Sequence, residues 1–238
     1  MGTAERKQKE KEERERLFLT RAGEMIRDEG LLNLQMARLA ESCEYATGTL
    51  YQHFSSKEDL LVALAEQGAH RHVDVFRRAL AWQAGTRDRM FAIAVGDVHF
   101  ARKNPQYAKL IQYVFAEAVW ENALPERRQS LLGHCEPITE IIRSLVREAI
   151  YHGDLRAGGS LHEMELALGP WCLCEGMHSL VHTQGLLEKC RIHRPEELLF
   201  VNVQLLLNGM GWQPLMEPVE PAATQALADR IRRDVFES

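Results

Sequence analysis

The sequence has few cysteines, no long apolar run and no excess of positive charge. Its five cysteines in 238 residues are an odd number and thinly spread, which excludes the disulfide framework of a small secreted domain. The apolar runs are far shorter than the roughly 20 residues that a membrane-spanning helix needs. Residues 1–16 alternate Lys or Arg with Glu and lack the apolar centre of a signal peptide. We therefore expect a protein of the reducing cytoplasm, without a membrane partner.

Positive charge is scarce both overall and near the N-terminus. The formal net charge is −5, and residues 1–60 contain ten Lys or Arg against twelve Asp or Glu. This balance excludes a protein that coats nucleic acid through its total charge. Any contact with DNA must come from a compact group of residues that is placed locally.

Helical periodicity runs through almost the whole chain, and strand-like alternation is scarce. We expect helices near residues 5–29, 33–41, 46–54, 57–82, 86–103, 105–121, 125–152, 160–188, 194–211 and 222–236. Gly30 ends the first helix, Asn33 caps the second, and Ser55 or Ser56 caps the long helix from Lys57. Gly85 marks a domain boundary. The prediction is an all-α protein with an N-terminal domain (1–60), a connecting helix and linker (61–85) and a C-terminal helical bundle (86–238).

Two short helices joined at residues 42–45, with longer helices on either side, form a helix-turn-helix pattern within a three-helix N-terminal domain. The second short helix carries no charge but has hydroxyls, an amide, a phenol and an imidazole. Leu50 and Phe54, four residues apart, can face the core. The polar residues then point outward, where such groups suit base edges and phosphates: Thr47, Thr49, Tyr51, Gln52 and His53. Gly48 allows backbone to approach DNA closely, and Lys57 offers a charge to a phosphate.

The run Gly48–Leu60, GTLYQHFSSKEDL, resembles the Gly-Thr-Leu-Tyr-x-His-Phe-x-Ser-Lys-Glu-x-Leu signature of the tetracycline-repressor-type (TetR) family. The resemblance covers roughly residues 17–65. It implies a DNA-binding head, a helical sensing domain with a cavity, and a dimer made mainly by the last two long helices. It also implies that phosphates contact Tyr51, His53 and Lys57, that Thr47, Gly48 and Thr49 lie at the groove floor, and that Gln35 and Met36 approach the DNA backbone.

The turn between the two short helices departs from the family pattern. Glu44-Tyr45-Ala46 stands where the family usually has Gly-Val-Ser. Without the glycine, Glu44 must adopt an unfavourable or altered backbone conformation. Without the serine, the helix cap passes to Thr47 or the helix begins elsewhere. Tyr45 becomes an additional candidate for DNA contact, so these changes affect which operator is read and not the mode of binding.

The helix near 194–211 is too apolar to be buried on one side only. A four-helix interface between two copies would cover the remaining face, with Leu198, Val201 and Leu205 as its dimerisation residues. Two-fold symmetry in the protein predicts a palindromic operator.

For an effector pocket, we expect aromatic and polar residues on the inward faces of the C-terminal helices. The candidates are Phe100, Tyr107, Ile111, Phe115, Trp120, His134, Trp171, Glu175 and His178. Any single aromatic residue in this set is equally consistent with plain core packing. Trp171, Glu175 and His178 are the stronger candidates, because polar groups on an apolar inward face need a partner.

Two other chemistries remain open for the same helix. Glu175, His178 and His182 lie three and four residues apart, near Cys172 and Cys174, and could bind a metal ion or be hydrogen-bonded packing residues. No matching cluster occurs elsewhere, so we expect no metal and no cofactor. A thiol switch would use Cys172, Cys174 or Cys190, although Cys172 and Cys174 point to different faces of the helix.

The expected function is a ligand-responsive transcription regulator, a repressor by the habit of the family. It would bind palindromic double-stranded operator DNA as a homodimer and be released by a small, largely apolar effector. One alternative is a constitutive DNA-binding or adaptor dimer with a filled core. Another is an α-helical enzyme, but the sequence lacks a nucleophile elbow, a phosphate loop and a paired metal motif, so we expect no enzyme.

Overall fold

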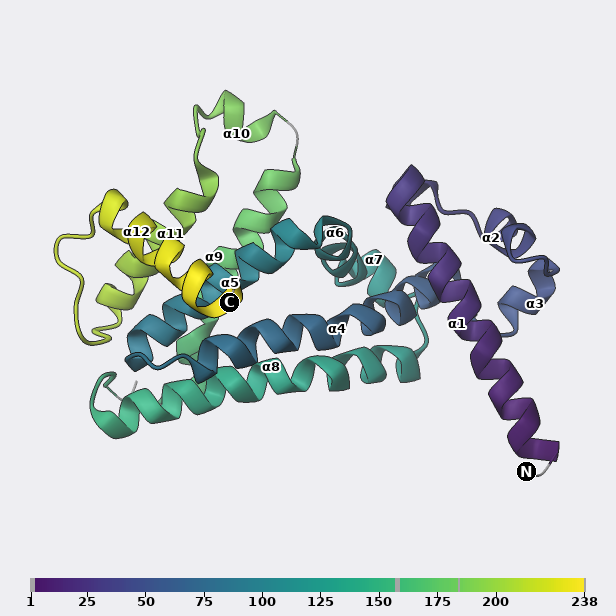
Figure 1. The fold of residues 1–238 in the computed structure, drawn as a ribbon, viewed down its shortest axis with the longest axis horizontal. Helices are drawn as coiled ribbons and strands as arrows, with labels where there is room; N and C mark the ends of the chain where they lie inside the picture. The colour runs from purple at the N-terminus through teal and green to yellow at the C-terminus, as the bar shows by residue number, and fades with distance from the viewer. Residues whose placement is uncertain (1–2, 157–158, 184, 238) are drawn as a thin grey trace. The chain divides into compact units, whose positions relative to one another are not determined.

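The computed structural model describes residues 3–156, 159–183 and 185–237, and all regular structure in these ranges is helical (Figure 1). The all-α prediction is thereby confirmed. In chain order the helices are α1 (Thr3–Glu29), the 3-10 turn η1 (Leu31–Asn33), α2 (Met36–Ser42), α3 (Thr47–Tyr51), α4 (Lys57–Ala81), α5 (Thr86–Lys103), α6 (Pro105–Val114), α7 (Glu117–Trp120), α8 (Pro125–His152), α9 (Glu163–His182), α10 (Leu186–Lys189), α11 (Pro195–Gly209), α12 (Pro221–Ile231) and the π-helical η2 (Arg232–Phe236).

Most predicted helices occur within a few residues of their expected ends, and Gly30, with φ 90°, follows the last residue of α1 as predicted. Two predicted helices are each divided: 105–121 into α6 and α7, and 160–188 into α9 and α10. Asn33 does not cap α2. Its side-chain amide donates to the carbonyl of Glu29 (2.6 Å) and so closes the end of α1, while Gln35 takes the extended position before α2.

The chain forms two compact units. The N-terminal unit consists of Met1–Ala69 and Pro105–His134, and the C-terminal unit of His70–Asn104 and Cys135–Ser238. Helices α4 and α8 each contribute to both units. The sequence-based division at residues 60 and 85 did not anticipate that residues 105–134 pack with the N-terminal helices.

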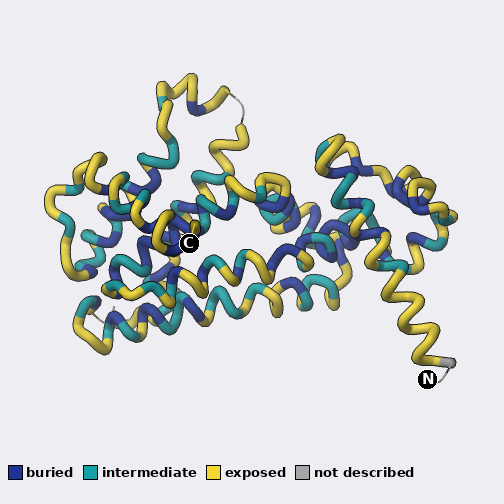
Figure 2. Tube along the Cα trace, viewed as in Figure 1, coloured by how far each residue is buried: buried dark blue, intermediate teal, exposed yellow. Residues whose placement is uncertain are grey.

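The core of the N-terminal unit is made by the apolar stripe of α1 against α2, α3 and the start of α4. Its fully buried side chains include Phe18, Ala22, Leu39, Leu50, Phe54 and Leu60. Burial of each large apolar side chain contributes about 1.5–3 kcal/mol. Residues 4–13 of α1 lie beyond this core and are exposed (Figure 2).

The start of α8 is fastened to the N-terminal helices by polar contacts within the same unit. The Arg127 guanidinium lies 3.0 Å from the carboxylate of Glu15 and 5.6 Å from the centre of the Phe54 ring. The hydroxyl of Ser56 donates to the carbonyl of Asn122 (3.0 Å). These contacts join segments more than sixty residues apart and hold the entry to α4 in place.

The C-terminal unit has a separate apolar core to which α5, α9, α11 and α12 contribute, together with the His70–Ala81 end of α4 and the C-terminal part of α8. Phe91, Leu145, Phe200 and Trp212 are among its fully buried members. Buried Arg87 joins α5 to the later chain, donating to the carbonyl of Trp212 (2.5 Å) and to the side-chain oxygen of Gln204 (2.7 Å). Such buried hydrogen bonds help to determine how the helices are aligned.

None of the helices within the described ranges is both long and apolar enough to cross a lipid bilayer.

Candidate DNA interface and sensing residues

Helices α2 and α3 form the predicted helix-turn-helix, with Cys43–Ala46 as the turn. Glu44 has φ 61°, a left-handed conformation that L-residues adopt at a cost of about 1–2 kcal/mol. The expectation of an altered backbone at this position is confirmed. The amide of Tyr45 donates to the carbonyl of Ala40 (3.0 Å), so the tight turn is closed by hydrogen bonds although glycine is missing.

The outer face of α3 is polar and uncharged. The helix begins at Thr47 after Ala46, which provides no side-chain cap, so the expected loss of the cap is confirmed. Thr47 does not take over the cap, and the helix does not begin elsewhere. Leu50 is fully buried, whereas Gly48 and Gln52 are exposed and the Tyr51 side chain is 49% exposed. Thr47 and Thr49 are half-buried. A Cβ atom at Gly48 would meet nothing within 4 Å, so packing within the protein does not require glycine here. A close approach of backbone at Gly48 would involve an external partner.

Two predicted contact residues point inward. The side chain of His53 is only 3% exposed, and its ring centre lies 5.5 Å from that of Phe18. His53 lies after the last residue of α3 and three residues after buried Leu50, and its ring packs against α1, so its expected outward orientation is wrong. Burial lowers the pKa of His53, although nearby Glu15 partly opposes this, which favours the neutral ring. Met36, at the start of α2, is buried in the same core.

The other predicted contact residues remain near the surface. Gln35 is exposed, and Tyr45 is half-buried with its ring edge-on to Phe18 (5.4 Å between centres). The Lys57 ammonium lies 3.3 Å from the carbonyl of Leu32. Ser56 caps α4 as predicted, since its hydroxyl accepts the amide of Asp59 (3.0 Å).

Comparison with known proteins identifies this domain. The family model "Bacterial regulatory proteins, tetR family" matches residues 18–64, which include both short helices and the turn. The chain carries the N-terminal DNA-binding domain of the TetR family. It is accordingly a DNA-binding transcription regulator with an N-terminal helix-turn-helix. No protein with a curated description matches it by sequence.

Solved structures share the TetR fold over most of the chain. A protein of unknown function from Rhodococcus sp. RHA1 is 22% identical, with a TM-score of 0.62, over 83% of this chain and 95% of its own. A tetR-family regulatory protein from Rhodococcus RHA1 is 18% identical (TM-score 0.60; 83% and 97% covered). FadR from Bacillus subtilis, solved in complex with stearoyl-CoA, is 17% identical (TM-score 0.59; 81% and 97% covered). At these identities the likeness concerns the fold alone.

The nine candidate effector residues are divided between the two units. Tyr107, Ile111, Phe115, Trp120 and His134 belong to the N-terminal unit, and Phe100, Trp171, Glu175 and His178 to the C-terminal unit. Tyr107 is buried and covers Gly68 so closely that a Cβ there would lie 2.1 Å from its ring. Phe100 is also buried, while Ile111 and Trp120 are half-buried. The expected inward orientation is wrong for four residues that are exposed in the chain: Phe115, His134, Trp171 and Glu175.

His178 has the partner that its position required. Its Nε2 lies 2.7 Å from one carboxylate oxygen of Asp97, and Nε2 of His72 lies 2.8 Å from the other. Burial by itself would raise the pKa of Asp97, but hydrogen bonds from both histidines hold it well below its ordinary range. Burial would lower the pKa of His178, but Asp97, with Glu175 and Glu196, raises it. This histidine–aspartate bridge connects α4, α5 and α9.

Sequence reasoning missed Asp97 and His72. A signal was present, because Asp97 follows seven residues without charge, Met90–Gly96, and a charge on an apolar helix needs a partner. The identity of the partner could not be found in this way, since His72 is on another helix.

The proposed metal ligands do not converge. His178 bonds to Asp97, and Nδ1 of His182 lies 2.6 Å from the carbonyl of His178. The structure places no three His, Cys, Asp or Glu residues so that they could hold a metal ion, within the part of the chain it describes. Glu175 instead accepts the indole N–H of Trp171 (3.3 Å).

The cysteines are free thiols. Cys172 and Cys190 are exposed, whereas Cys174 is buried, and burial raises the pKa of Cys174 well above its ordinary value. Its reactive thiolate form is therefore disfavoured. Redox chemistry at Cys172 and Cys190 stays a prediction.

Large apolar side chains are exposed along α9 and the neighbouring α11. We call Leu168 and Trp171 of α9, with Leu198, Val201 and Leu205 of α11, the α9–α11 face. Val201 is half-buried, and the other four side chains are between 41% and 56% exposed. Leu199, Phe200 and Val203 of α11 are buried in the core, so α11 is apolar on both sides. Exposed apolar residues grouped in this way indicate an interaction surface.

Proposed function

We propose that the chain is a ligand-responsive transcription repressor that binds a palindromic operator as a homodimer. The observation that carries the proposal is the uncharged polar face of α3, exposed within the segment that matches the TetR family. A short helix with hydroxyl, amide and phenol groups can read base edges in a major groove, while neighbouring groups bind phosphates.

The proposed DNA contacts are assigned according to how far each side chain is exposed. Thr47, Gly48 and Thr49 approach the groove floor, Gln52 reads a base edge, and Tyr51 binds a phosphate. Gln35 and Tyr45 lie beside this surface and contact the DNA backbone. Met36 and His53 act from inside, by supporting α2 and α3, because their side chains are buried. Lys57 provides the positive charge.

The proposed effector is a small molecule with a large apolar part. Support comes from the FadR structure of the same fold, which contains stearoyl-CoA. Effector binding would favour a dimer whose two heads no longer match successive major grooves, through α4, which runs from one unit into the other.

The protein acts by binding in the cytoplasm and not by catalysis. A constitutive dimer would show no gain in melting temperature with any effector, whereas a sensor gains stability from its ligand.

Selection of bound duplexes from a random pool tests the proposal directly. The wild-type protein is expected to enrich a palindrome whose half-sites are about one helical turn apart. The matched variant Gln52→Ala should lose preference at particular base pairs while it keeps binding. No enrichment at moderate salt with a folded, dimeric protein would exclude operator recognition.

Lys57→Ala is expected to weaken binding to every duplex to a similar degree. If the ammonium neutralises one phosphate, the slope of log affinity against log salt should fall by about 0.9. Fluorescence anisotropy over a range of salt concentrations measures the slope, and Lys57→Arg, which keeps the charge, should restore it. An unchanged slope in Lys57→Ala would remove this contact from the interface.

Leu205→Glu is expected to produce a folded monomer. Its side chain is half exposed on the α9–α11 face, so the new carboxylate is tolerated in the single chain but would be buried without a partner between two copies. Sedimentation measures the association state, and operator affinity should fall with it. Leu132→Glu, at an exposed leucine of α8 outside this face, is the control. A dimeric Leu205→Glu protein would place the interface elsewhere.

A further inference from the structure

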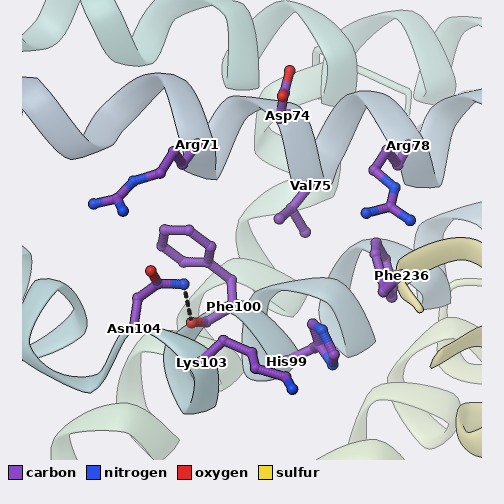
Figure 3. Close-up of a pocket in the computed structure, with 9 residues that line it drawn as sticks. All are labelled: Arg71, Asp74, Val75, Arg78, His99, Phe100, Lys103, Asn104 and Phe236. Atoms are coloured by element: carbon purple, nitrogen blue, oxygen red, sulfur yellow. Dashed lines mark hydrogen bonds between the residues drawn. The ribbon is translucent and has the colours of Figure 1, made fainter. Parts of the chain in front are cut away.

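A groove of about 270 Å³ lies in the C-terminal unit between α4, α5 and η2 (Figure 3). One wall comes from α4, the other from the last turns of α5, and η2 contributes Phe236. Its lining residues are Arg71, Asp74, Val75, Arg78, His99, Phe100, Lys103, Asn104 and Phe236. Phe100 was among the candidate effector residues, and the others were not.

Three lining cations have no carboxylate partner. Arg71, Arg78 and Lys103 make no ion pair with any Asp or Glu in residues 3–156, 159–183 or 185–237. Their immediate neighbours do: Arg77 pairs with Asp74 (3.4 Å) and Arg102 with Glu196 (3.2 Å). Arg77 and Arg102, which pair with carboxylates, do not line the groove, whereas the three cations that line it have no such pair.

Negative charge is directed away from the groove. The Asp74 carboxylate points to the opposite side of α4, whereas the Arg78 guanidinium extends towards the groove (Figure 3). Glu237 lies close enough to His99 to act on its pKa, but burial lowers that pKa, with Lys103 contributing in the same direction. The neutral imidazole therefore adds a polar group but no charge, and the balance at the groove is positive.

The interior of the groove is apolar and aromatic. Val75 and Phe100 project into it from opposite walls (Figure 3). Phe236 stacks on His99, with ring centres 5.6 Å apart, and the Arg78 guanidinium lies 5.8 Å from the centre of the Phe236 ring. Cations beside aromatic rings suit a ligand with both an anionic group and a hydrocarbon part.

We propose that this groove binds a small amphiphilic anion. A carboxylate or phosphate group is held by Arg71, Arg78 and Lys103, and a short hydrocarbon part lies against Val75, Phe100 and Phe236. Arginine guanidinium groups bind both kinds of oxyanion through paired hydrogen bonds. A nucleic-acid backbone would use the cations but leave the apolar interior unused. The inference goes beyond the proposed function, because such binding does not require the chain to bind DNA.

Calorimetric titration of the full-length protein with octyl phosphate tests the site. Inorganic phosphate represents the anionic group alone, and uncharged octyl glucoside represents the hydrocarbon chain alone. All three compounds are used at concentrations below micelle formation. Octyl phosphate is expected to bind at least about tenfold more tightly than either one, and its affinity should fall as salt screens the charges. The double variant Arg71→Gln/Arg78→Gln should lose about tenfold or more in affinity. Both side chains are exposed, so the variant should keep its melting temperature.

Arg77→Gln is the matched control, since it removes an equally exposed arginine from the same helix but outside the groove. Its affinity for octyl phosphate should equal that of the wild type. Equal binding of inorganic phosphate would make this a simple anion site, and equal binding of octyl glucoside an apolar patch; either result overturns the proposal. Displacement of octyl phosphate by random-sequence duplex DNA would assign the cations to nucleic acid. Operator selection is independent of these titrations, so the two proposals can fail separately.

Discussion

Asp97→Ala is expected to destabilise the C-terminal unit by about 3 kcal/mol or more, as measured by urea denaturation. The substitution removes a carboxylate that accepts hydrogen bonds from two largely buried imidazoles, His72 and His178, which belong to different helices. Both rings would then lose the bond that Asp97 accepts from Nε2, and the cost of burying these polar groups is no longer offset by it.

The same bridge predicts a pH dependence of stability. The pKa of Asp97 is depressed in the folded protein, so its contribution is present above the unfolded pKa, about 3.9, and is lost as pH falls through the folded value. The pKa of His178 is raised, so its contribution is present below the unfolded pKa, about 6.5, and is lost as pH rises through the folded value. The bridge should therefore stabilise most strongly between about pH 4 and pH 6.5.

Asp97→Asn separates charge from hydrogen bonding. The amide can still bond to both imidazoles, so the loss should be smaller than in the alanine variant. The decline of wild-type stability above pH 6.5 should become smaller, because the carboxylate of Asp97 no longer favours the protonated ring of His178 and only Glu175 and Glu196 still do. Asp74→Ala, which removes an exposed carboxylate, should change stability by less than about 0.5 kcal/mol. Parallel stability–pH curves for the wild type and Asp97→Asn would show that the bridge is not a charged unit.

Asp59→Ala is expected to cost about 2–4 kcal/mol and to loosen the entry to α4. The Asp59 side chain is fully buried, and its two oxygens accept the amides of Ser55 (3.0 Å) and Leu124 (3.3 Å). Arg127 lies 3.9 Å from the same carboxylate. One side chain thereby joins the turn after α3 to the segment that begins α8.

The effect on DNA binding should exceed the effect on global unfolding, because the turn that positions α3 depends on Asp59. Urea denaturation gives the stability, and anisotropy with the selected duplex gives the affinity. Glu58→Ala is the neighbouring control; Glu58 is only half-buried, and its loss should change stability by less than about 0.5 kcal/mol. If Asp59→Ala matched Glu58→Ala in both measurements, the buried carboxylate would not hold these segments together.

Local features were accurately predicted from the sequence where neighbouring residues determine them. The helix ends at Gly30 and Ser56, the unusual backbone of Glu44 and the absence of a side-chain cap at Ala46 all follow from residues within one turn. The errors concerned side chains one or two helical turns away from the residues on which the prediction was based. His53 was assigned to the outside because Leu50 and Phe54 were expected to face the core, whereas the structure buries its imidazole against Phe18.

By itself, the sequence determined the all-α class, the helix-turn-helix and the family, because helical periodicity, capping and a contiguous signature are all encoded by residues close together in the chain. Only the tertiary structure decided that residues 105–134 pack with the N-terminal helices, that Asp97 bridges His72 and His178, and that unpaired cations of α4 and α5 line one groove. Each of these depends on which helix faces cover one another. Helices with similar apolar stripes can pair in many ways, and the free energy that selects one arrangement comes from the packing of the whole core.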